Sequence, residues 1–359
     1  MKKNYLLFLL LYTCFTFAQV DSKLLVDTWY LTDVKMKDGS EIFLKSANDY
    51  KNYGFDFRKK TYSYNDIHRL EQGLTFQIPY ILKGNELVTA QDSSLLLEKL
   101  TSDSMIISQK IQNMEDKDLL RYYLVPLKKV REEQYEATKT KDTLIATPVL
   151  GPFFTKGLTR RNIKTLDETH FITAGETAAF KFNGTLLFDI EKKKIIPLIK
   201  NFDSKYKENI QQKLEFLTKN KDWSFSNVKD YKYVKIPFSF IHYYETKDRT
   251  ESYGDLYTLY TDKYEDVFVS EEIGISDIEQ SNKLFNSAIF EFKKMNYKTA
   301  IDLFEKSFKV NKRNLNAYYN FADINFAIGE KDKACKMYQF LSNESQKTAQ
   351  RIFAEKCGN

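Results

Sequence analysis

The segment "AIFEFKKMNYKTAIDLF", residues 288–304, is repeated in pattern by "ADINFAIGEKDKACKMY", residues 322–338. The two segments begin 34 residues apart, at positions 288 and 322. Aligned positions keep their class, either small or aromatic: Ala288 with Ala322, Phe292 with Phe326, Ala300 with Ala334, and Phe304 with Tyr338. Small residues let two paired helices approach closely, while aromatic residues fill the space beside them. The pattern therefore predicts that the chain ends in two copies of a helical hairpin.

This repeat resembles the tetratricopeptide repeat, which is marked by a small residue, an aromatic residue and then an Ala-x3-aromatic group. The resemblance covers residues 281–342, although Lys312 stands where the family has a proline. The following segment "ESQKTAQRIFAEKC", residues 344–357, is interpreted as a capping helix with Ile352 and Phe353 facing inward. We therefore expect a helical repeat tail over residues 273–359.

In the tetratricopeptide family the first helix of each unit lines a concave surface that binds peptides. The resemblance implies two pairs of equivalent partner-binding residues: Asn286 with Asn320, and Phe290 with Ile324. Asparagines can bond an extended backbone, and the apolar pair can take up a partner's side chain. The alternative is a structural appendage in which Phe290 and Ile324 bury against a neighbouring domain. Because two units are fewer than such arrays need alone, we expect the tail to pack on the middle domain.

Residues 19–130 read as many short strands with regular turns, which is typical of a small antiparallel β-barrel. With Trp29 on the first strand, the hairpins "YILKGNELV" (80–88) and "LLLEKLTSDSMIIS" (95–108) resemble the lipocalin-like domains of Bacteroidetes envelope proteins. That resemblance implies an up-and-down barrel able to carry an apolar small molecule. The alternative is a barrel filled by its own side chains, with Trp29 as a plug at one end.

Residues 131–148 are polar and lack periodicity, so we interpret them as a linker. Residues 149–272 then predict an α+β domain with antiparallel strands and one helix. Its predicted elements are a hairpin of two strands in "FNGTLLFDIEKKKIIPLIK" (182–200) and a helix presenting Ile210, Leu214 and Leu217, followed by an alternating strand at 233–244 with Val234, Ile236, Phe238 and Phe240 on one face. This order resembles the TonB C-terminal domain through Gly184-Thr185-Leu186, Trp223 and Ile236-Pro237-Phe238. The family's proline-rich spacer and anchor are absent, so the resemblance implies an accessory envelope module.

Residues 1–18 have the features of a signal peptide: basic Lys2 and Lys3, an apolar run, and small residues before a cleavage site after Ala18. The alternatives are an uncleaved anchor and lipidation at Cys14. We expect a periplasmic or secreted protein that is not integral to the membrane after processing. Its 53 remaining basic residues (55 less Lys2 and Lys3) against 49 acidic ones give no reason to expect nucleic-acid binding.

No catalytic, metal or cofactor site is predicted. The closest glycines, Gly151 and Gly157, are too far apart for a nucleotide-binding loop, and His68, His170 and His242 lie in separate segments. Cys335 and Cys357 either form a disulfide or stay free thiols.

The favoured function is non-catalytic binding or assembly in the cell envelope, with an envelope protein or peptide as partner. Carriage of an apolar small molecule and an unrecognised hydrolase are the alternatives. A cavity inside the barrel would favour the carrier, and a cleft joining a histidine to a carboxylate would favour the hydrolase.

Overall fold

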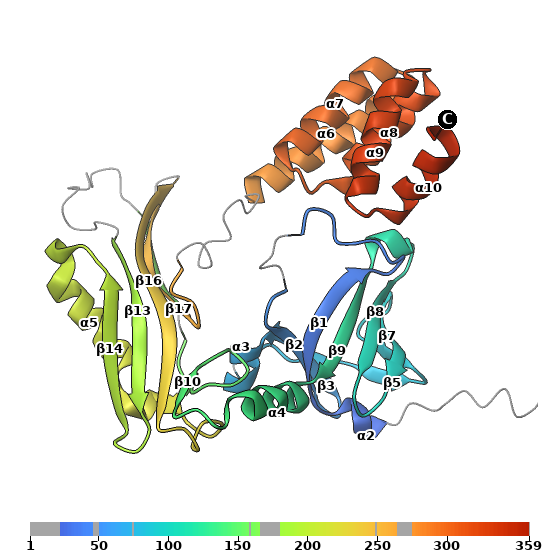
Figure 1. Ribbon diagram of the computed structural model, residues 1–359. Coiled ribbons are helices and arrows are strands. Elements are labelled where there is room, and N and C mark those ends of the chain that lie inside the picture. Colours follow the sequence, from blue (N-terminus) through green and yellow to red (C-terminus); the bar gives the residue numbers. More distant parts are fainter. Residues whose placement is uncertain are drawn as a thin grey trace, which may run out of the picture.

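The computed structural model describes residues 22–45, 50–73, 75–157, 159–165, 180–247, 250–263 and 275–358. It contains two sheet-based parts and a C-terminal helical part (Figure 1). The predicted multidomain α+β class is therefore confirmed at that level. The predicted signal peptide with its cleavage site, Cys14 and His170 lie outside the described residues.

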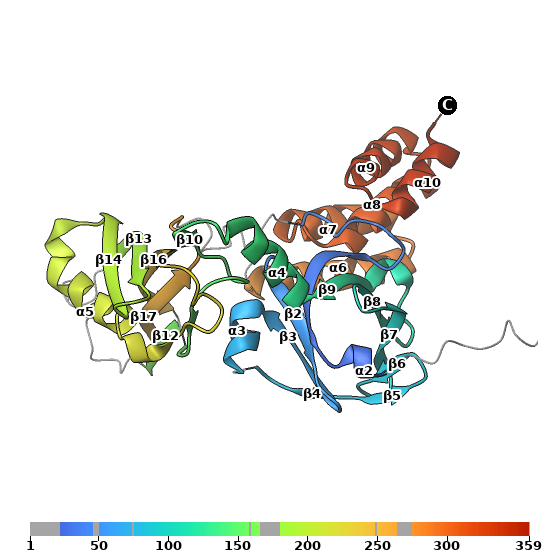
Figure 2. The same cartoon turned by 60° about the horizontal axis from the view of Figure 1, so that its bottom comes forward.

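The first part is a nearly closed antiparallel sheet of nine strands in the order β4-β3-β2-β1-β9-β8-β7-β6-β5. The strands are β1 Thr28–Met36, β2 Tyr53–Phe57, β3 Thr61–Asp66, β4 Ile78–Pro79, β5 Ile81–Lys83, β6 Glu86–Val88, β7 Ser93–Leu100, β8 Met105–Ile111 and β9 Leu120–Pro126. β1 and β9, the first and last strands along the chain, pair with each other. The two edge strands of the sheet, β4 and β5, are separated in the sequence by Tyr80 alone. The strands therefore follow one another around a barrel (Figure 2).

The interior of the barrel is packed with its own side chains, because alternate residues of each strand point inward. Phe55 and Phe57 stack with ring centroids 5.6 Å apart, and the Tyr122 ring meets Phe55 edge-on. Trp29 is 1% exposed, and its Nε1 donates to the backbone oxygen of Leu25 in the short helix α2, Ser22–Leu25. The core of the barrel is thus a cluster of aromatic and aliphatic side chains.

The segment predicted as an irregular linker is ordered. Helix α4 spans Leu127–Thr138 and leads into strand β10, Thr143–Ile145, which pairs with the second sheet. The sequence shows no helical periodicity here, because Leu127 is the only residue of α4 that is buried. Most of α4 lies between the two sheets and not on a hydrophobic core, so the helix carries no apolar face (Figure 1).

The second sheet has the order β12-β17-β16-β13-β14, with β10 pairing to β16. Its strands are β12 Thr159–Thr165, β13 Phe180–Asp189, β14 Lys194–Asn201, β16 Tyr233–Lys247 and β17 Thr250–Leu259. The predicted hairpin and the predicted alternating strand are both present, as β13, β14 and β16. Gly184 is required where β13 meets β14, since an added Cβ would lie 2.2 Å from the Leu198 backbone oxygen.

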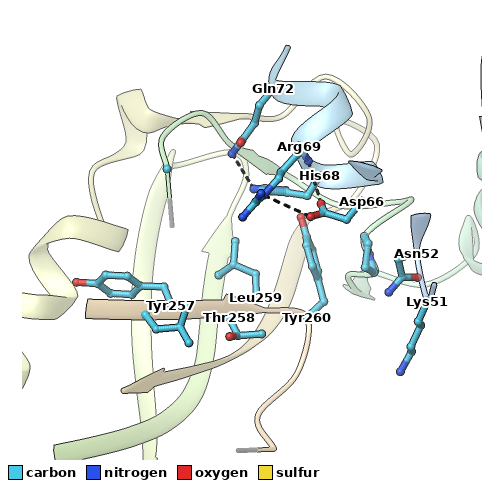
Figure 3. A pocket seen from close by; sticks show the side chains of 13 residues that line it. Lys51, Asn52, Asp66, His68, Arg69, Gln72, Tyr257, Thr258, Leu259 and Tyr260 are labelled. Carbon is cyan, nitrogen blue, oxygen red and sulfur yellow. Dashed lines mark hydrogen bonds and ion pairs between the residues drawn. The ribbon is translucent and has the colours of Figure 1, made fainter. Parts of the chain in front are cut away.

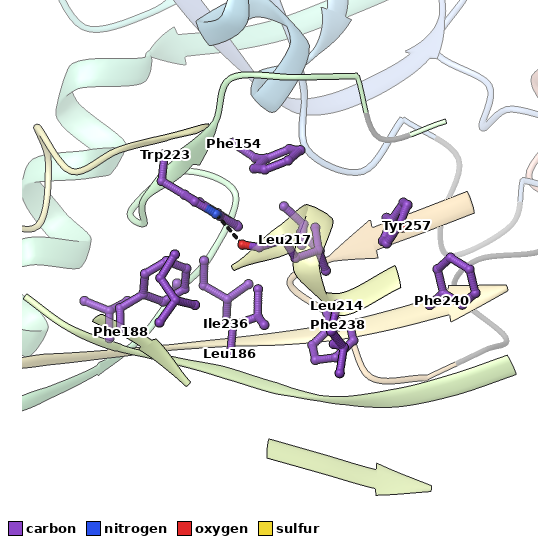
Figure 4. Close-up of a cluster of buried hydrophobic side chains, with 14 of the residues drawn as sticks. Phe154, Leu186, Phe188, Leu214, Leu217, Trp223, Ile236, Phe238, Phe240 and Tyr257 are labelled. Carbon is purple, nitrogen blue, oxygen red and sulfur yellow. Dashed lines mark hydrogen bonds between the residues drawn. The ribbon is translucent and has the colours of Figure 1, made fainter. Parts of the chain in front are cut away.

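Helix α5, Lys207–Leu217, covers one face of this sheet, as predicted from its apolar spacing. Ile210, Leu214 and Leu217 are buried against Val234, Ile236, Phe238 and Phe240. Trp223 of the short strand β15, Trp223–Ser224, donates from Nε1 to the Leu217 backbone oxygen at 2.7 Å (Figure 4). β15 pairs with β11, Phe153–Phe154, so the Phe154 ring covers Trp223.

The C-terminal part consists of five helices: α6 Ile275–Lys293, α7 Tyr297–Val310, α8 Leu315–Ala327, α9 Lys331–Asn343 and α10 Lys347–Lys356. The repeat positions Ala288, Ala300, Ala322 and Ala334 are fully buried, as the close approach of paired helices requires. Ile352 and Phe353 of α10 pack against Tyr338, in agreement with the predicted capping helix. A disulfide joins Cys335 to Cys357 and holds this cap on α9.

The tail contacts the barrel, so the expectation that it packs on the middle domain is wrong. Phe43, in the loop after β1, is 6% exposed and packs edge-on against Tyr318. In the α9–α10 turn, Gln346 Nε2 donates to the Glu41 backbone oxygen and Lys347 N donates to Ser40 Oγ, each at 2.9 Å. This contact could not be predicted from local patterns, because it joins the loop at 37–45 to helices about 275 residues later in the chain.

Candidate functional site

The four predicted partner-binding residues lie on the first helices of the two hairpins, as expected, but their surroundings differ. Asn286 and Phe290 on α6 are exposed, with Phe290 at 58%. Asn320 on α8 is half-buried, and its Nδ2 donates to the Asn316 backbone oxygen. Ile324 is only 4% exposed and packs in the core formed with Ala288 and Phe304, so it does not face a groove.

The exposed residues of α6 form a continuous ridge. Ile278, Asn282, Asn286 and Phe290 follow one another at spacings of four residues, which places them along one helical row. All four are exposed, and we call them the α6 ridge. Beyond its end, Lys294 Nζ lies 4.0 Å from the centre of the Phe290 ring. The ridge therefore combines apolar ends with two amide side chains able to donate and accept hydrogen bonds.

The ridge lies where a preceding hairpin would stack. Ile324 occupies the position equivalent to Phe290, 34 residues later, and the preceding hairpin buries it. Nothing equivalent covers Phe290 among the residues that the structure describes. In repeat arrays an exposed end normally carries polar residues or a cap. Sequence reasoning identified Asn286 and Phe290 but missed Ile278 and Asn282, which the four-residue spacing could have supplied.

A second feature is a cleft between the barrel and the second sheet (Figure 3). The cavity measures about 470 Å³ and is lined by helix α3, Ile67–Gln72, and by the end of β17. An adjoining hollow of about 420 Å³ shares Lys51, Asn52 and Tyr260 with it. Clefts between domains are common places for ligands. This cleft has mixed charge, because Arg69 Nε pairs with Asp66 Oδ2 at 3.6 Å in its wall.

Hydrogen bonds beside the cleft connect helices α3 and α4 with each other and with the segment that leads into the second sheet. Gln72 of α3 donates to the backbone oxygens of Phe154 and Lys156. Arg131 of α4 donates to Glu71 at 2.7 Å and to the Val149 backbone oxygen at 3.0 Å. These bonds make the cleft a joint that connects the two parts of the molecule.

His68 and Asp66 both line this cleft, which is the kind of juxtaposition that would favour a hydrolase. His68 is 8% exposed, and burial lowers its pKa from 6.5 to about 4. Its Nε2 contacts the Gln72 amide at 2.9 Å, while Nδ1 has no hydrogen-bond partner among the described residues. Asp66 accepts from Arg69 N as the cap of α3. Burial therefore keeps this imidazole neutral near neutral pH, and among the described residues no hydrogen bond joins it to Asp66.

A second histidine–carboxylate pair lies on the helix-covered face of the second sheet. His242 Nδ1 is 2.9 Å from Asp255 Oδ1, and Lys213 Nζ is 2.7 Å from Asp255 Oδ2. Burial alone would raise the pKa of Asp255, but hydrogen bonds from His242 and Lys213 hold it below its usual value. Both carboxylate oxygens are therefore engaged, and the cluster satisfies a buried charge. No local sequence pattern predicts this cluster, because its members lie on three separate elements.

Searches for related proteins add no family to this picture. No family model matches the chain, and the search of curated proteins finds no match either. In the part of the chain that the structure describes, no helix is both long and apolar enough to cross a membrane. Within the same residues, no cluster of three or more His, Cys, Asp or Glu side chains could hold a metal ion.

Proposed function

We propose that this protein is a non-catalytic binding protein of the cell envelope that holds a helical segment of a protein partner on the α6 ridge. One observation carries the proposal: Phe290 is 58% exposed, whereas its equivalent Ile324 is 4% exposed. The chain's own first hairpin provides the pattern for the partner, because its Ala288 and Phe304 pack against Ile324, the α8 equivalent of Phe290. An amphipathic helix with an apolar row at four-residue spacing would fit the ridge.

Three further features support this role. The tail's likeness to tetratricopeptide repeats points to protein partners. The Cys335–Cys357 disulfide suits an oxidising compartment beyond the inner membrane, as the predicted signal peptide requires. The packed barrel interior, with Phe55, Phe57 and Trp29 buried, weighs against carriage of an apolar small molecule. The tetratricopeptide, lipocalin-like and TonB-like assignments of the three parts belong to the same proposal.

The test is co-purification from the native envelope with the tagged full-length chain, followed by identification of the partner segment. Phe290→Asp should lose the partner, because a carboxylate replaces the apolar end of the ridge. Phe76→Asp is the matched control, since Phe76 is an exposed phenylalanine on the barrel, at 83%.

A synthetic peptide of the partner segment should become helical on binding to the wild-type chain, and should bind Phe290→Asp much more weakly. Equal retention of the partner by Phe290→Asp would overturn the proposal. So would a partner segment that binds in an extended form. If the chain associates with itself and Phe290→Asp abolishes this association, the occupant of the ridge is a second copy of the chain and not another protein.

A further inference from the structure

The hairpin turns at one end of the tail are exposed and point away from the rest of the molecule. Consecutive helices of the tail run back and forth, so the α6–α7 and α8–α9 turns lie at the same end (Figure 1). The α9–α10 turn, which contacts Ser40 and Glu41 of the barrel, lies at the opposite end. The barrel contact therefore leaves the α6–α7 turn projecting freely.

The α6–α7 turn has an unusual residue at its sharpest point. Met295 has a φ of +63°, in the left-handed region, and its equivalent in the second hairpin is Gly329 with a φ of +90°. Non-glycine residues meet a steric penalty in this region, so glycine is the usual choice. Met295 is also 73% exposed, which places a long apolar side chain in solvent. A left-handed backbone and a highly exposed apolar side chain coincide at Met295, which makes this position a candidate contact point.

Aromatic and basic residues surround Met295. Phe292 is 43% exposed and Tyr297 is 38% exposed, with their ring centroids 5.8 Å apart. Lys293 and Lys298 are exposed on either side. We call these five residues the α6–α7 tip. Lys294 pairs with Glu291 at 3.4 Å, so residues 291–298, with Lys293, Lys294 and Lys298 against one Glu, carry a net charge of +2.

We propose that the α6–α7 tip inserts into the surface of an anionic lipid bilayer, with Met295, Phe292 and Tyr297 in the interfacial region and the lysines at the headgroups. Aromatic side chains favour the membrane–water interface, and each basic residue near an anionic surface adds attraction. The tip is a convex turn and not a groove, so it suits a soft surface that can close around it. This peripheral contact goes beyond the proposed partner binding and needs no partner.

The experiment is co-sedimentation of the purified full-length chain with two kinds of vesicle, phosphatidylcholine alone and an equal mixture of phosphatidylcholine and phosphatidylglycerol. The wild-type chain should bind the mixed vesicles and should bind phosphatidylcholine much less. Met295→Gly should lower the affinity for mixed vesicles about tenfold, through loss of the buried apolar side chain. Met295→Asn, which also tolerates the left-handed region, should give a similar loss.

The charge requirement is tested by the pair Lys293→Gln with Lys298→Gln, which should weaken binding to mixed vesicles by roughly 25-fold, at about fivefold for each lysine. Its matched control is Lys59→Gln with Lys60→Gln, which removes the same charge from an exposed turn of the barrel. An unchanged affinity in Met295→Gly, or an equal loss in the barrel control, would overturn the inference. Absence of wild-type binding to the mixed vesicles would overturn it as well.

Discussion

The two helical hairpins of the tail share one pattern but differ in what covers them. In the second hairpin, Ile324 is buried by the helices before it and the cap α10 is bonded to α9 through Cys335 and Cys357. In the first hairpin, Phe290 is exposed and Met295 replaces a turn glycine. The same local sequence therefore gives the same helices, while neighbouring elements decide which side chains are buried. This difference separates residues that stabilise the tail from residues available for binding.

The largest expected effect on stability comes from replacing the two equivalent residues, the buried Ile324 and the exposed Phe290, by alanine. Ile324→Ala should lower the free energy of unfolding of the tail by roughly 2–5 kcal/mol, through lost burial and a residual cavity. Phe290→Ala should change it by no more than about 0.5 kcal/mol, because an exposed side chain loses little. Urea unfolding followed by hydrogen exchange of tail amides measures both. Similar losses for the two variants would break the comparison.

Reduction of the disulfide should loosen only the covered end. The bridge spans 22 residues, and opening such a loop lowers stability by roughly 3 kcal/mol in the chain-entropy model. Amides of α9 and α10 should then exchange faster, while those of α6 keep their rates. Cys335→Ala with Cys357→Ala should reproduce the result without reductant. If α6 and α10 lost protection together, the tail would be one cooperative unit and the two ends would not differ.

Burial also changes the pKa of His68, which lies in the cleft between the barrel and the second sheet. The effect of burial can therefore be measured there as a dependence of stability on pH. The pKa of His68 is about 4 when folded and 6.5 ordinarily, so the unfolded chain binds more protons between these values. Stability therefore falls as pH drops through this window, by about 3 kcal/mol at roughly 1.4 kcal/mol per pKa unit. Asp66 and Arg69 face the same cleft and have opposite effects on this pKa.

His68→Gln cannot titrate and should show a smaller loss of stability between pH 6.5 and pH 4 than the wild-type chain. The measurement is the difference between the urea unfolding free energies of the two proteins at each pH. Parallel pH profiles would mean that burial does not hold His68 neutral.

The smallest effect is expected from exchanging the two turn residues. Met295→Gly should raise the free energy of unfolding by up to about 1 kcal/mol, since glycine relieves the left-handed strain. Gly329→Met should lower it by roughly 1–2 kcal/mol for the same reason. Thermal melts of the two variants give opposite shifts if the turns are equivalent. A loss of stability in Met295→Gly would mean that the Met295 side chain packs in the fold.

Local patterns were enough to predict the helices of the tail, the hairpin of β13 and β14, and the inward row of β16. Each follows from spacing within one element, as with Ala288 and Ala322 or Phe238 and Phe240. Contacts between distant elements left no such pattern. The packing of Phe43 on Tyr318 and the pairing of His242 with Asp255 and Lys213 depend on how separate elements meet. The exposure of Phe290 was likewise unpredictable, because its equivalent Ile324 is buried.

The central claim is that the α6 ridge binds a partner helix, and site-specific photocross-linking tests it most directly. A photoreactive phenylalanine analogue placed at Phe290 should cross-link one envelope protein, at apolar residues spaced four apart in a helical segment. The same analogue at Phe76, which is more exposed, should not cross-link that segment. Cross-links to the same segment from both positions, or none from Phe290 in native cells, would contradict the account.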